Sequence, residues 1–188
     1  IPSYFIRLQG CNLMCGGKNA EKLVSGKATW YCDTELVWRR GEGVSNEQLL
    51  ERFKASGQLE NILSGQTHLI WTGGEPTLEH HRQDITKFVQ YLHSMNPNNK
   101  AFHELETNGT IKVEPFFYSN IITQINASPK LSNSGESYER RVNPDAIKQI
   151  VAYPNSYFKF VVSNESDLRE AMLTYIKPFE IPRDKVLL

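Results

Sequence analysis

The sequence is poor in cysteine and has no long apolar run. Its 188 residues include three cysteines, Cys11, Cys15 and Cys32. An odd number this small does not make a disulfide framework, and it is typical of a reducing compartment and of a metal or cluster site. No run approaches the roughly 18 apolar residues that a membrane helix needs, and no signal-peptide pattern is present. We therefore expect a cytoplasmic protein that makes no use of a membrane.

The sequence also has no excess of charge of either sign. Lys plus Arg and Asp plus Glu number 21 each, so nothing favours electrostatic capture by nucleic acid. Internal repeats and low-complexity tracts are absent too. With 39% hydrophobic residues, residues 1–188 are expected to form a single domain with a real core. The chain begins at Ile1 in place of Met and stops in what looks like the start of a strand, so we expect terminal segments to be missing.

Short apolar runs alternate with amphipathic stretches along the chain. The expected strands are residues 4–8, 68–72, 102–106, 121–125, 157–162 and 185–188. Helical spacing predicts three to four helices between them, the clearest of which begin after Ser45, carry Ile85 to Met95, and begin at Pro144 after Asn143. This alternation predicts an α/β fold with about six mostly parallel strands. The polar stretch 132–142 has no periodicity and is expected to be a mobile lid.

The segments that carry chemistry follow directly after the expected strands. They are the cysteine loop (residues 11–43), Thr72-Gly73-Gly74-Glu75-Pro76, Glu106-Thr107-Asn108-Gly109-Thr110, and Ser128-Pro129-Lys130. In parallel α/β proteins the binding sites gather at the carboxyl ends of the strands. We therefore expect these four segments to meet at one edge of the sheet.

The cysteine loop is the strongest signal for a metal site. Most [4Fe–4S] clusters are bound by four thiolates. Three thiolates would leave one iron of the cluster open to another ligand. Sixteen residues separate Cys15 from Cys32, and Gly16, Gly17 and Gly26 allow this insert to loop out. Three free thiols, or a zinc site completed by a histidine, are the alternatives, although the close Cys-x-x-Cys pair usual in zinc sites is missing.

The segments after the other strands are suited to holding a small ligand. Gly73 and Gly74 let the backbone approach a ligand closely, and the Glu75 carboxylate suits an ammonium group. Asn108 and Ser128 follow the next two strands, and Lys130 can pair with a carboxylate. Each of these motifs alone is also a common turn, so their order along the chain is the informative feature.

The ordered set of motifs resembles the radical S-adenosylmethionine (radical SAM) superfamily, and within it the 7-carboxy-7-deazaguanine synthase family. The motifs are Arg7-Leu8-Gln9-Gly10-Cys11, Cys32-Asp33-Thr34, TGGEP, ETNGT and SPK, and they cover nearly the whole chain. The resemblance implies an abbreviated, partial (β/α) barrel. It also implies a carbon–nitrogen lyase of queuosine and 7-deazapurine biosynthesis, with a [4Fe–4S] cluster, S-adenosylmethionine and Mg²⁺ as cofactors.

The implied reaction converts 6-carboxy-5,6,7,8-tetrahydropterin to 7-carboxy-7-deazaguanine with loss of ammonia. It is started by a 5′-deoxyadenosyl radical, and the hydrogen is later returned, so S-adenosylmethionine is regenerated. The resemblance further implies a homodimer and a reductant such as flavodoxin or ferredoxin, with no nucleic-acid partner.

The resemblance also assigns residues, position by position. Cys11, Cys15 and Cys32 would bind the cluster, Thr34 would bind Mg²⁺, and Arg7 and Thr72 would bind the pterin. S-adenosylmethionine would be held by Gly73, Gly74, Glu75, Asn108, Ser128, Pro129, Lys130, Lys159, Val161 and Val162. Arg7 as an ordinary surface charge and Thr34 as a turn or helix cap are the alternatives.

The sequence departs from the family pattern in the spacing of its cysteines and in lacking segments at both ends that contact the pterin. Thr29 stands where one family variant has its middle cysteine, so Cys15 is expected to replace it. The nearest rival is a radical SAM activase that makes a glycyl radical on a partner protein, which would have no use for a magnesium site at Thr34. A zinc-stabilised binding module is a more distant rival. The pair His80-His81 is set aside as a metal site, because adjacent residues do not converge.

Overall fold

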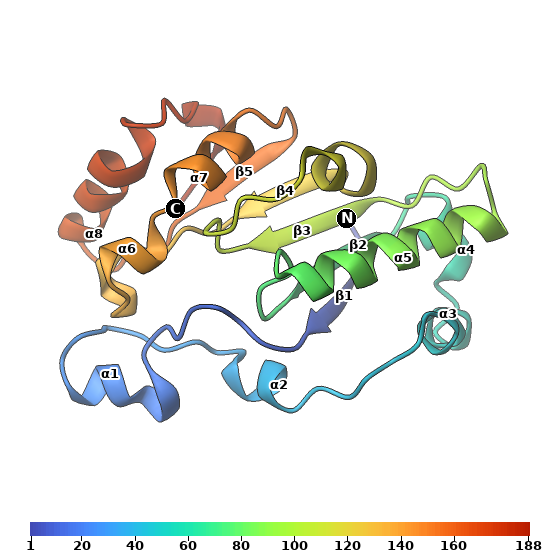
Figure 1. The fold of residues 1–188 in the computed structure, drawn as a ribbon, viewed down its shortest axis with the longest axis horizontal. Helices are drawn as coiled ribbons and strands as arrows, with labels where there is room; N and C mark the ends of the chain where they lie inside the picture. Colours follow the sequence, from blue (N-terminus) through green and yellow to red (C-terminus); the bar gives the residue numbers. More distant parts are fainter.

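The computed structural model describes residues 1–188 and contains one six-stranded sheet (Figure 1). All neighbouring strands are parallel, and their order in the sheet follows the sequence. The strands are β1 (Ser3–Leu8), β2 (His68–Gly73), β3 (His103–Thr107), β4 (Gln124–Ala127), β5 (Ser156–Lys159) and β6 (Val186–Leu187). The predicted α/β class and the six parallel strands are confirmed, and the arrangement is consistent with a partial barrel.

The helices are more numerous than predicted, because several of them are very short. There are eight α-helices: α1 (Glu21–Val24), α2 (Glu35–Arg39), α3 (Asn46–Ala55), α4 (Leu59–Leu63), α5 (Glu79–Met95), α6 (Tyr138–Arg141), α7 (Pro144–Val151) and α8 (Glu165–Glu170). A helix of four or five residues completes little more than one turn, so it produces no apolar period in the sequence. None of the helices has the length and the apolar character that a membrane crossing requires.

Two longer helices begin where the sequence predicted. The Ser45 side chain caps α3 by accepting a hydrogen bond from the Gln48 amide, and the Gln48 side chain accepts one in return from the Ser45 amide. The Asn143 side chain caps α7, whose first residue is Pro144. Local capping chemistry therefore determines both starting points.

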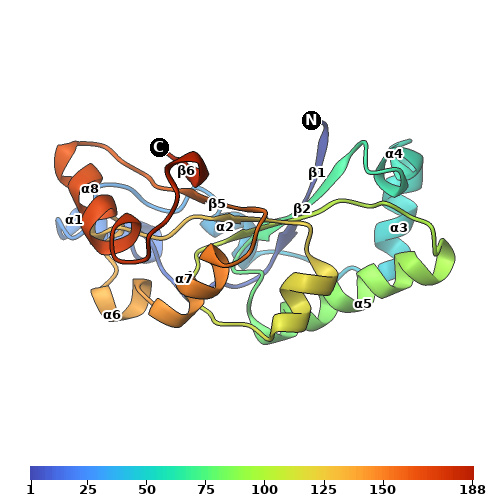
Figure 2. The same cartoon turned by 90° about the horizontal axis from the view of Figure 1, so that it is seen from above.

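The core lies between one face of the sheet and the helices α5 and α7, which cover that face (Figure 2). The α5 helix contributes Ile85, Phe88 and Leu92, all at most 1% exposed, and α7 contributes Ile147 and Ile150. These positions recur every three or four residues, as an amphipathic helix requires. The opposite face of the sheet is left free to carry polar side chains.

The fourth strand begins later than expected. Residues 117–121 form a π-helical turn, and β4 starts only at Gln124. Phe117, Tyr118 and Ile121 are buried at helical spacing, so the apolar run predicted as a strand over 121–125 divides between a helical turn and a strand.

The expected lid over residues 132–142 is incorrect. This segment folds into a 3₁₀ turn at Ser132–Ser134 followed by α6. Asn133, Ser134, Glu136 and Arg141 are buried. Polar side chains can be buried in this way when they are hydrogen-bonded, and these side chains bind other parts of the chain as described below.

Candidate active site

A cavity of about 560 Å³ lies at the carboxyl ends of the strands, and the cysteine loop with α1 and α2 runs across these ends (Figure 1). Most of the residues that the motifs single out line this cavity. They are Arg7, Cys11, Cys15, Cys32, Thr34, Thr72, Gly73, Gly74, Glu75, Asn108, Ser128, Lys130, Lys159 and Val161. Arg7 and Val161, 154 positions apart in the sequence, therefore meet at one site, as the parallel topology leads one to expect.

Two of the predicted residues are not part of the lining. Pro129 is buried and does not line the cavity, and Val162 packs against the hydrophobic core. Their neighbours in the sequence do line the cavity. A segment can therefore reach the site without every one of its residues facing it.

All three cysteines are free thiols and line the cavity. No three side chains of His, Cys, Asp or Glu are grouped closely enough to hold a metal ion. The cavity lining includes no histidine that could complete a zinc site. A set of three thiols suits an iron–sulfur cluster with one open iron better than it suits zinc, which takes four ligands in structural sites.

Burial keeps two of these thiols protonated. It raises the pKa of Cys11 to about 11 and that of Cys15 to about 12, and the positive charge of Lys130 opposes the increase in both cases. At neutral pH both side chains are therefore thiols in the metal-free chain. A metal that binds them has to displace these protons.

Thr34 lies at the N-cap position of α2 but does not cap the helix, because its side chain makes no hydrogen bond to the first turn. Its Oγ1 atom is 3.2 Å from the Sγ atom of Cys32 and 3.5 Å from the carbonyl oxygen of Gly73. The hydroxyl lies beside the cavity, between the cysteine loop and the end of β2. It is therefore available to a ligand there.

Close packing of the backbone requires the two glycines at the end of β2, Gly73 and Gly74. A Cβ atom on Gly74 would lie 1.7 Å from the carbonyl oxygen of Gly10, and one on Gly73, whose φ is +102°, would lie 2.6 Å from the Leu8 amide nitrogen. The Gly74 and Glu75 amides donate to the carbonyl oxygens of Leu8 and Gly10. This close approach fixes the chain just before Cys11 against the end of β2.

The Glu75 carboxylate is used within the protein. It is 1% exposed and accepts hydrogen bonds from the Thr77 hydroxyl and amide at 2.5 and 3.0 Å, from the Thr107 hydroxyl at 2.7 Å, and from the Asn108 amide at 2.8 Å. The side chain thus joins the TGGEP turn to the ETNGT turn. The carboxylate is therefore already occupied and is not free to bind a ligand ammonium at this turn.

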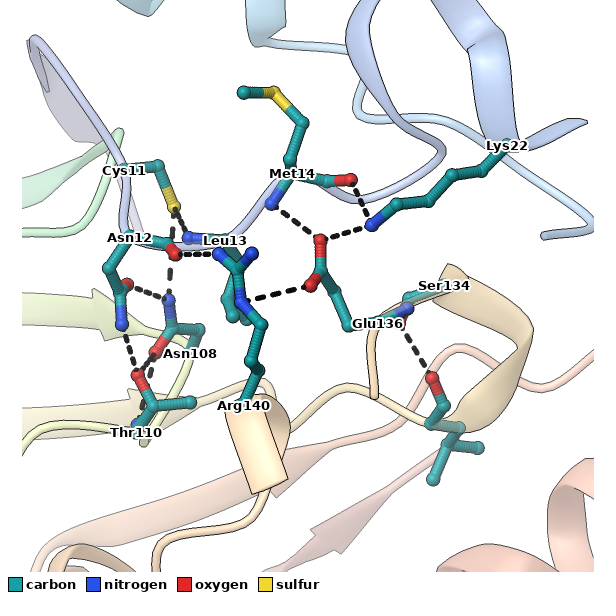
Figure 3. A network of polar contacts seen from close by, with 11 residues as sticks. Cys11, Asn12, Leu13, Met14, Lys22, Asn108, Thr110, Ser134, Glu136 and Arg140 are labelled. Atoms are coloured by element: carbon teal, nitrogen blue, oxygen red, sulfur yellow. Dashed lines mark hydrogen bonds and ion pairs between the residues drawn. The ribbon is translucent and has the colours of Figure 1, made fainter. Parts of the chain in front are cut away.

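Asn108 joins the ETNGT turn to the cysteine loop (Figure 3). Its Nδ2 atom donates to the side-chain oxygen of Asn12 at 2.9 Å and lies 3.8 Å from the Sγ atom of Cys11. The Asn12 amide in turn donates to the Thr110 hydroxyl at 2.8 Å. Asn108 therefore helps to orient Cys11. Lys130 follows the next strand, lines the cavity, and its ammonium donates to both oxygens of Ser128.

A row of side chains across five strands forms one wall of the cavity, and three of its members were not predicted. Arg7 pairs with Thr72 in the register of β1 and β2, Glu106 pairs with Asn126, and Asn126 pairs with Tyr157. The Thr72 hydroxyl donates to a Glu106 carboxylate oxygen at 2.6 Å. The signal for Glu106, Asn126 and Tyr157 is their place near the end of each strand, on the face opposite the core.

The insert between Cys15 and Cys32 also reaches the cavity. Trp30 belongs to the lining, its indole N–H donates to the side-chain oxygen of Asn133 at 3.0 Å, and the Lys130 ammonium lies 6.0 Å from the centre of its ring. The insert therefore supplies an aromatic surface to the site.

Comparison with known proteins finds several similar sequences that carry one name. A 7-carboxy-7-deazaguanine synthase of Pyrobaculum aerophilum is 29% identical over 189 aligned positions, which cover all of this chain. Synthases with the same name from Hyperthermus butylicus and Clostridium acetobutylicum are 26% and 28% identical and cover 98% and 90% of the chain. The chain is similar to 7-carboxy-7-deazaguanine synthases. The resemblance predicted from the motifs is thereby confirmed.

The similarity covers only part of these synthases. The chain spans 69%, 66% and 64% of the length of the three relatives. No family model matches the chain. The names of the relatives support an enzyme of the 7-carboxy-7-deazaguanine synthase kind.

Proposed function

We propose that the protein is a radical SAM carbon–nitrogen lyase that converts 6-carboxy-5,6,7,8-tetrahydropterin to 7-carboxy-7-deazaguanine with loss of ammonia. The observation that carries the proposal is that three cysteines, Thr34, Arg7 and Thr72 line one cavity in a chain similar to synthases of this name. A [4Fe–4S] cluster on Cys11, Cys15 and Cys32 and bound S-adenosylmethionine would supply the radical that starts the reaction.

The row of side chains across the sheet is suited to the pterin. Arg7 has no ion-pair partner in the chain, so its planar guanidinium is available to bind the substrate carboxylate. The Glu106 carboxylate, held by Thr72, is complementary to the N–H groups on the amino-pyrimidine edge of a pterin. The Thr34 hydroxyl is a hard oxygen donor of the kind that Mg²⁺ accepts beside a carboxylate.

The opposite side of the cavity is suited to S-adenosylmethionine. The Lys130 ammonium would pair with the carboxylate of its methionyl group, and the backbone of residues 73–75 would accept hydrogen bonds from its ammonium. Asn108 and Ser128 lie beside these groups, and Lys159 and Val161 would close the site at the end of β5. Two further parts of the proposal are a reductant such as flavodoxin or ferredoxin and a homodimer, which light scattering of the purified protein would detect.

The experiment that tests the proposal is an anaerobic assay of the protein after reconstitution with iron and sulfide. S-adenosylmethionine, dithionite, Mg²⁺ and 6-carboxy-5,6,7,8-tetrahydropterin are added, and mass spectrometry follows 7-carboxy-7-deazaguanine. We expect the product to form with little net loss of S-adenosylmethionine. Thr34→Ala should weaken the dependence on Mg²⁺, and Arg7→Ala should raise the KM for the pterin.

Other outcomes of the same assay have distinct meanings. Formation of 5′-deoxyadenosine without the product would leave a radical SAM enzyme with another substrate, such as an activase. Zinc in place of iron and sulfide, with neither product formed, would favour a binding module.

A further inference from the structure

The long insert between Cys15 and Cys32 is closed at its base by one other segment of the chain. The Gly16 amide donates to the carbonyl oxygen of Ser134 at 2.8 Å, and the Thr29 amide donates to that of Asn133 at 2.9 Å. The two ends of the insert are therefore held on adjacent residues. Beyond this closure the two cysteines lie side by side, and the Cys32 amide donates to the carbonyl oxygen of Cys15 at 3.1 Å.

The start of the cysteine loop is held by the same segment, through Glu136 (Figure 3). The Glu136 side chain is 1% exposed. Its Oε1 atom accepts hydrogen bonds from the Met14 amide at 2.8 Å and from the Lys22 ammonium at 2.5 Å. Its Oε2 atom lies 3.3 Å from the Nε atom of Arg140, and Arg140 itself donates to the carbonyl oxygen of Asn12 at 2.6 Å.

The buried Glu136 carboxylate is suited to this task because it stays ionised. Burial acts to raise its pKa, but the hydrogen bonds from Lys22 and the Met14 amide, together with the charges of Lys22 and Arg140, lower it below the usual range. Hydrogen bonds to a charged acceptor are stronger than those between neutral groups. Their donors come from both sides of Cys15 in the sequence.

Asn133 and Gly135 of the same segment also make close contacts with the rest of the chain. The Asn133 side chain accepts from the Trp30 indole and donates to the carbonyl oxygen of Val161 at 2.9 Å, so it joins the insert to the end of β5. Gly135 has a φ of +77°, and a Cβ atom there would lie 2.8 Å from the Lys22 side chain and 3.0 Å from the carbonyl oxygen of Lys27. We call residues 133–140 the anchor segment.

We propose that Glu136 and Asn133 are positioning residues, which hold the cysteine loop so that Cys15 and Cys32 reach the cavity despite the sixteen residues between them. The inference rests on the proposed function only in identifying the metal as an iron–sulfur cluster. The anchoring itself is a property of the metal-free chain. The polar stretch 132–142 thus acts as a fixed support for the cysteines in place of a lid.

Hydrogen–deuterium exchange of the metal-free protein tests the anchoring directly. In Glu136→Ala we expect amides of residues 11–31 to exchange about tenfold faster or more, because opening the loop no longer breaks bonds to a buried charge. Glu136→Gln keeps an acceptor for the Met14 amide and should give a smaller increase. Glu114→Gln is the matched control. Glu114 pairs with Arg82 at an N–O distance of 3.0 Å, and neither residue belongs to the cysteine loop. This variant should leave the exchange rates of residues 11–31 unchanged.

A second variant tests the other contact of the anchor segment. Asn133→Ala should accelerate exchange near Thr29 and Trp30 more than near Met14, whose amide Glu136 still holds. In all variants the amides of β2 to β4 should keep the exchange rates of the unaltered protein. Unchanged exchange of residues 11–31 in Glu136→Ala, or an equal increase throughout β2 to β4, would overturn the proposal, the latter by showing a merely structural role.

Iron and sulfide uptake separates this inference from the proposed function. We expect Glu136→Ala to bind several-fold less iron than the unaltered chain, with Glu136→Gln between the two. If exchange changes as described but the unaltered chain takes up no iron, the proposed function fails and the anchoring stands. If Glu136→Ala takes up iron fully, the positioning role is wrong even if the synthase activity is present.

Discussion

Glu75 is the residue whose expected role changes most once its surroundings are known. The sequence indicated a carboxylate for a ligand ammonium, whereas in the structure four hydrogen bonds from Thr77, Thr107 and Asn108 use it within the protein. The sequence shows that a carboxylate follows two glycines. It does not show that Thr107 and Asn108, about thirty residues later, donate hydrogen bonds to that carboxylate.

The first prediction follows from these bonds. We expect Glu75→Gln to lower the free energy of unfolding by about 2 kcal/mol, because an amide loses the charge and places an N–H against donors. Glu106→Gln is the matched control, since Glu106 is less buried and accepts from Thr72 within the chain, and it should cost about 1 kcal/mol or less. Urea unfolding measures both, and equal losses would contradict the role given to Glu75.

Gly74 gives a second prediction. A Cβ atom there would lie 1.7 Å from the carbonyl oxygen of Gly10, so Gly74→Ala must push apart the end of β2 and the chain before Cys11. We expect a loss of about 3 kcal/mol in the free energy of unfolding. Gly43→Ala meets no atom within 4 Å and should change the stability by less than about 0.5 kcal/mol. A Gly74→Ala protein as stable as the Gly43→Ala protein would show that the close approach is not needed.

His103 makes the stability depend on pH. Burial lowers its pKa from 6.5 to about 4, and its neutral ring accepts a hydrogen bond from the Trp71 indole at 3.2 Å. Between pH 6.5 and about 4 the unfolded chain binds a proton that the folded chain does not bind, so stability falls as the pH falls.

The third prediction is that His103→Gln, which keeps an acceptor for Trp71, removes this part of the pH dependence. The slope of the unfolding free energy should decrease by up to about 1.4 kcal/mol per pH unit in this range. Urea unfolding at several pH values gives the slopes. Parallel curves for the two proteins would contradict the buried neutral state of His103.

At the scale of elements, the sequence predicted best where local chemistry decides. The caps at Ser45 and Asn143 and the apolar period of α5 place three helices correctly. The short helices α1 and α2 and the turn at 117–121 were missed, because one helical turn has no detectable period. The anchor segment was missed for a different reason. The partners of its buried polar residues Asn133 and Glu136 include Met14, Lys22 and Trp30, and those three residues are more than a hundred positions away in the sequence.

The packing of α5 gives a fourth prediction. Phe88 is 1% exposed and makes edge contacts with the rings of Phe53 and Trp71. We expect Phe88→Ala to cost about 3–5 kcal/mol in the free energy of unfolding, through lost burial and the cavity that remains. Phe116→Ala, at a side chain that is 51% exposed, is the control and should cost less than about 1 kcal/mol. Comparable losses in both variants would mean that α5 does not form the core contact described.

At the scale of the whole molecule, the sequence located the site but could not complete it. Because each motif follows a strand, the parallel topology was enough to bring Cys11, Thr72, Asn108 and Lys130 to one cavity. Glu106, Asn126 and Tyr157 join them through the register of neighbouring strands. Register depends on the packing of the entire sheet, so these residues could be recognised only after the strands were placed.

The central claim is that three cysteines separated by a long insert bind one cluster with an iron left for S-adenosylmethionine. Electron paramagnetic resonance of the reconstituted and reduced protein, recorded before and after S-adenosylmethionine is added, tests it most directly. We predict the signal of a single [4Fe–4S] cluster per chain and a change of that signal on adding S-adenosylmethionine. A spectrum that S-adenosylmethionine leaves unchanged, or a protein that holds zinc and no iron, would contradict the account.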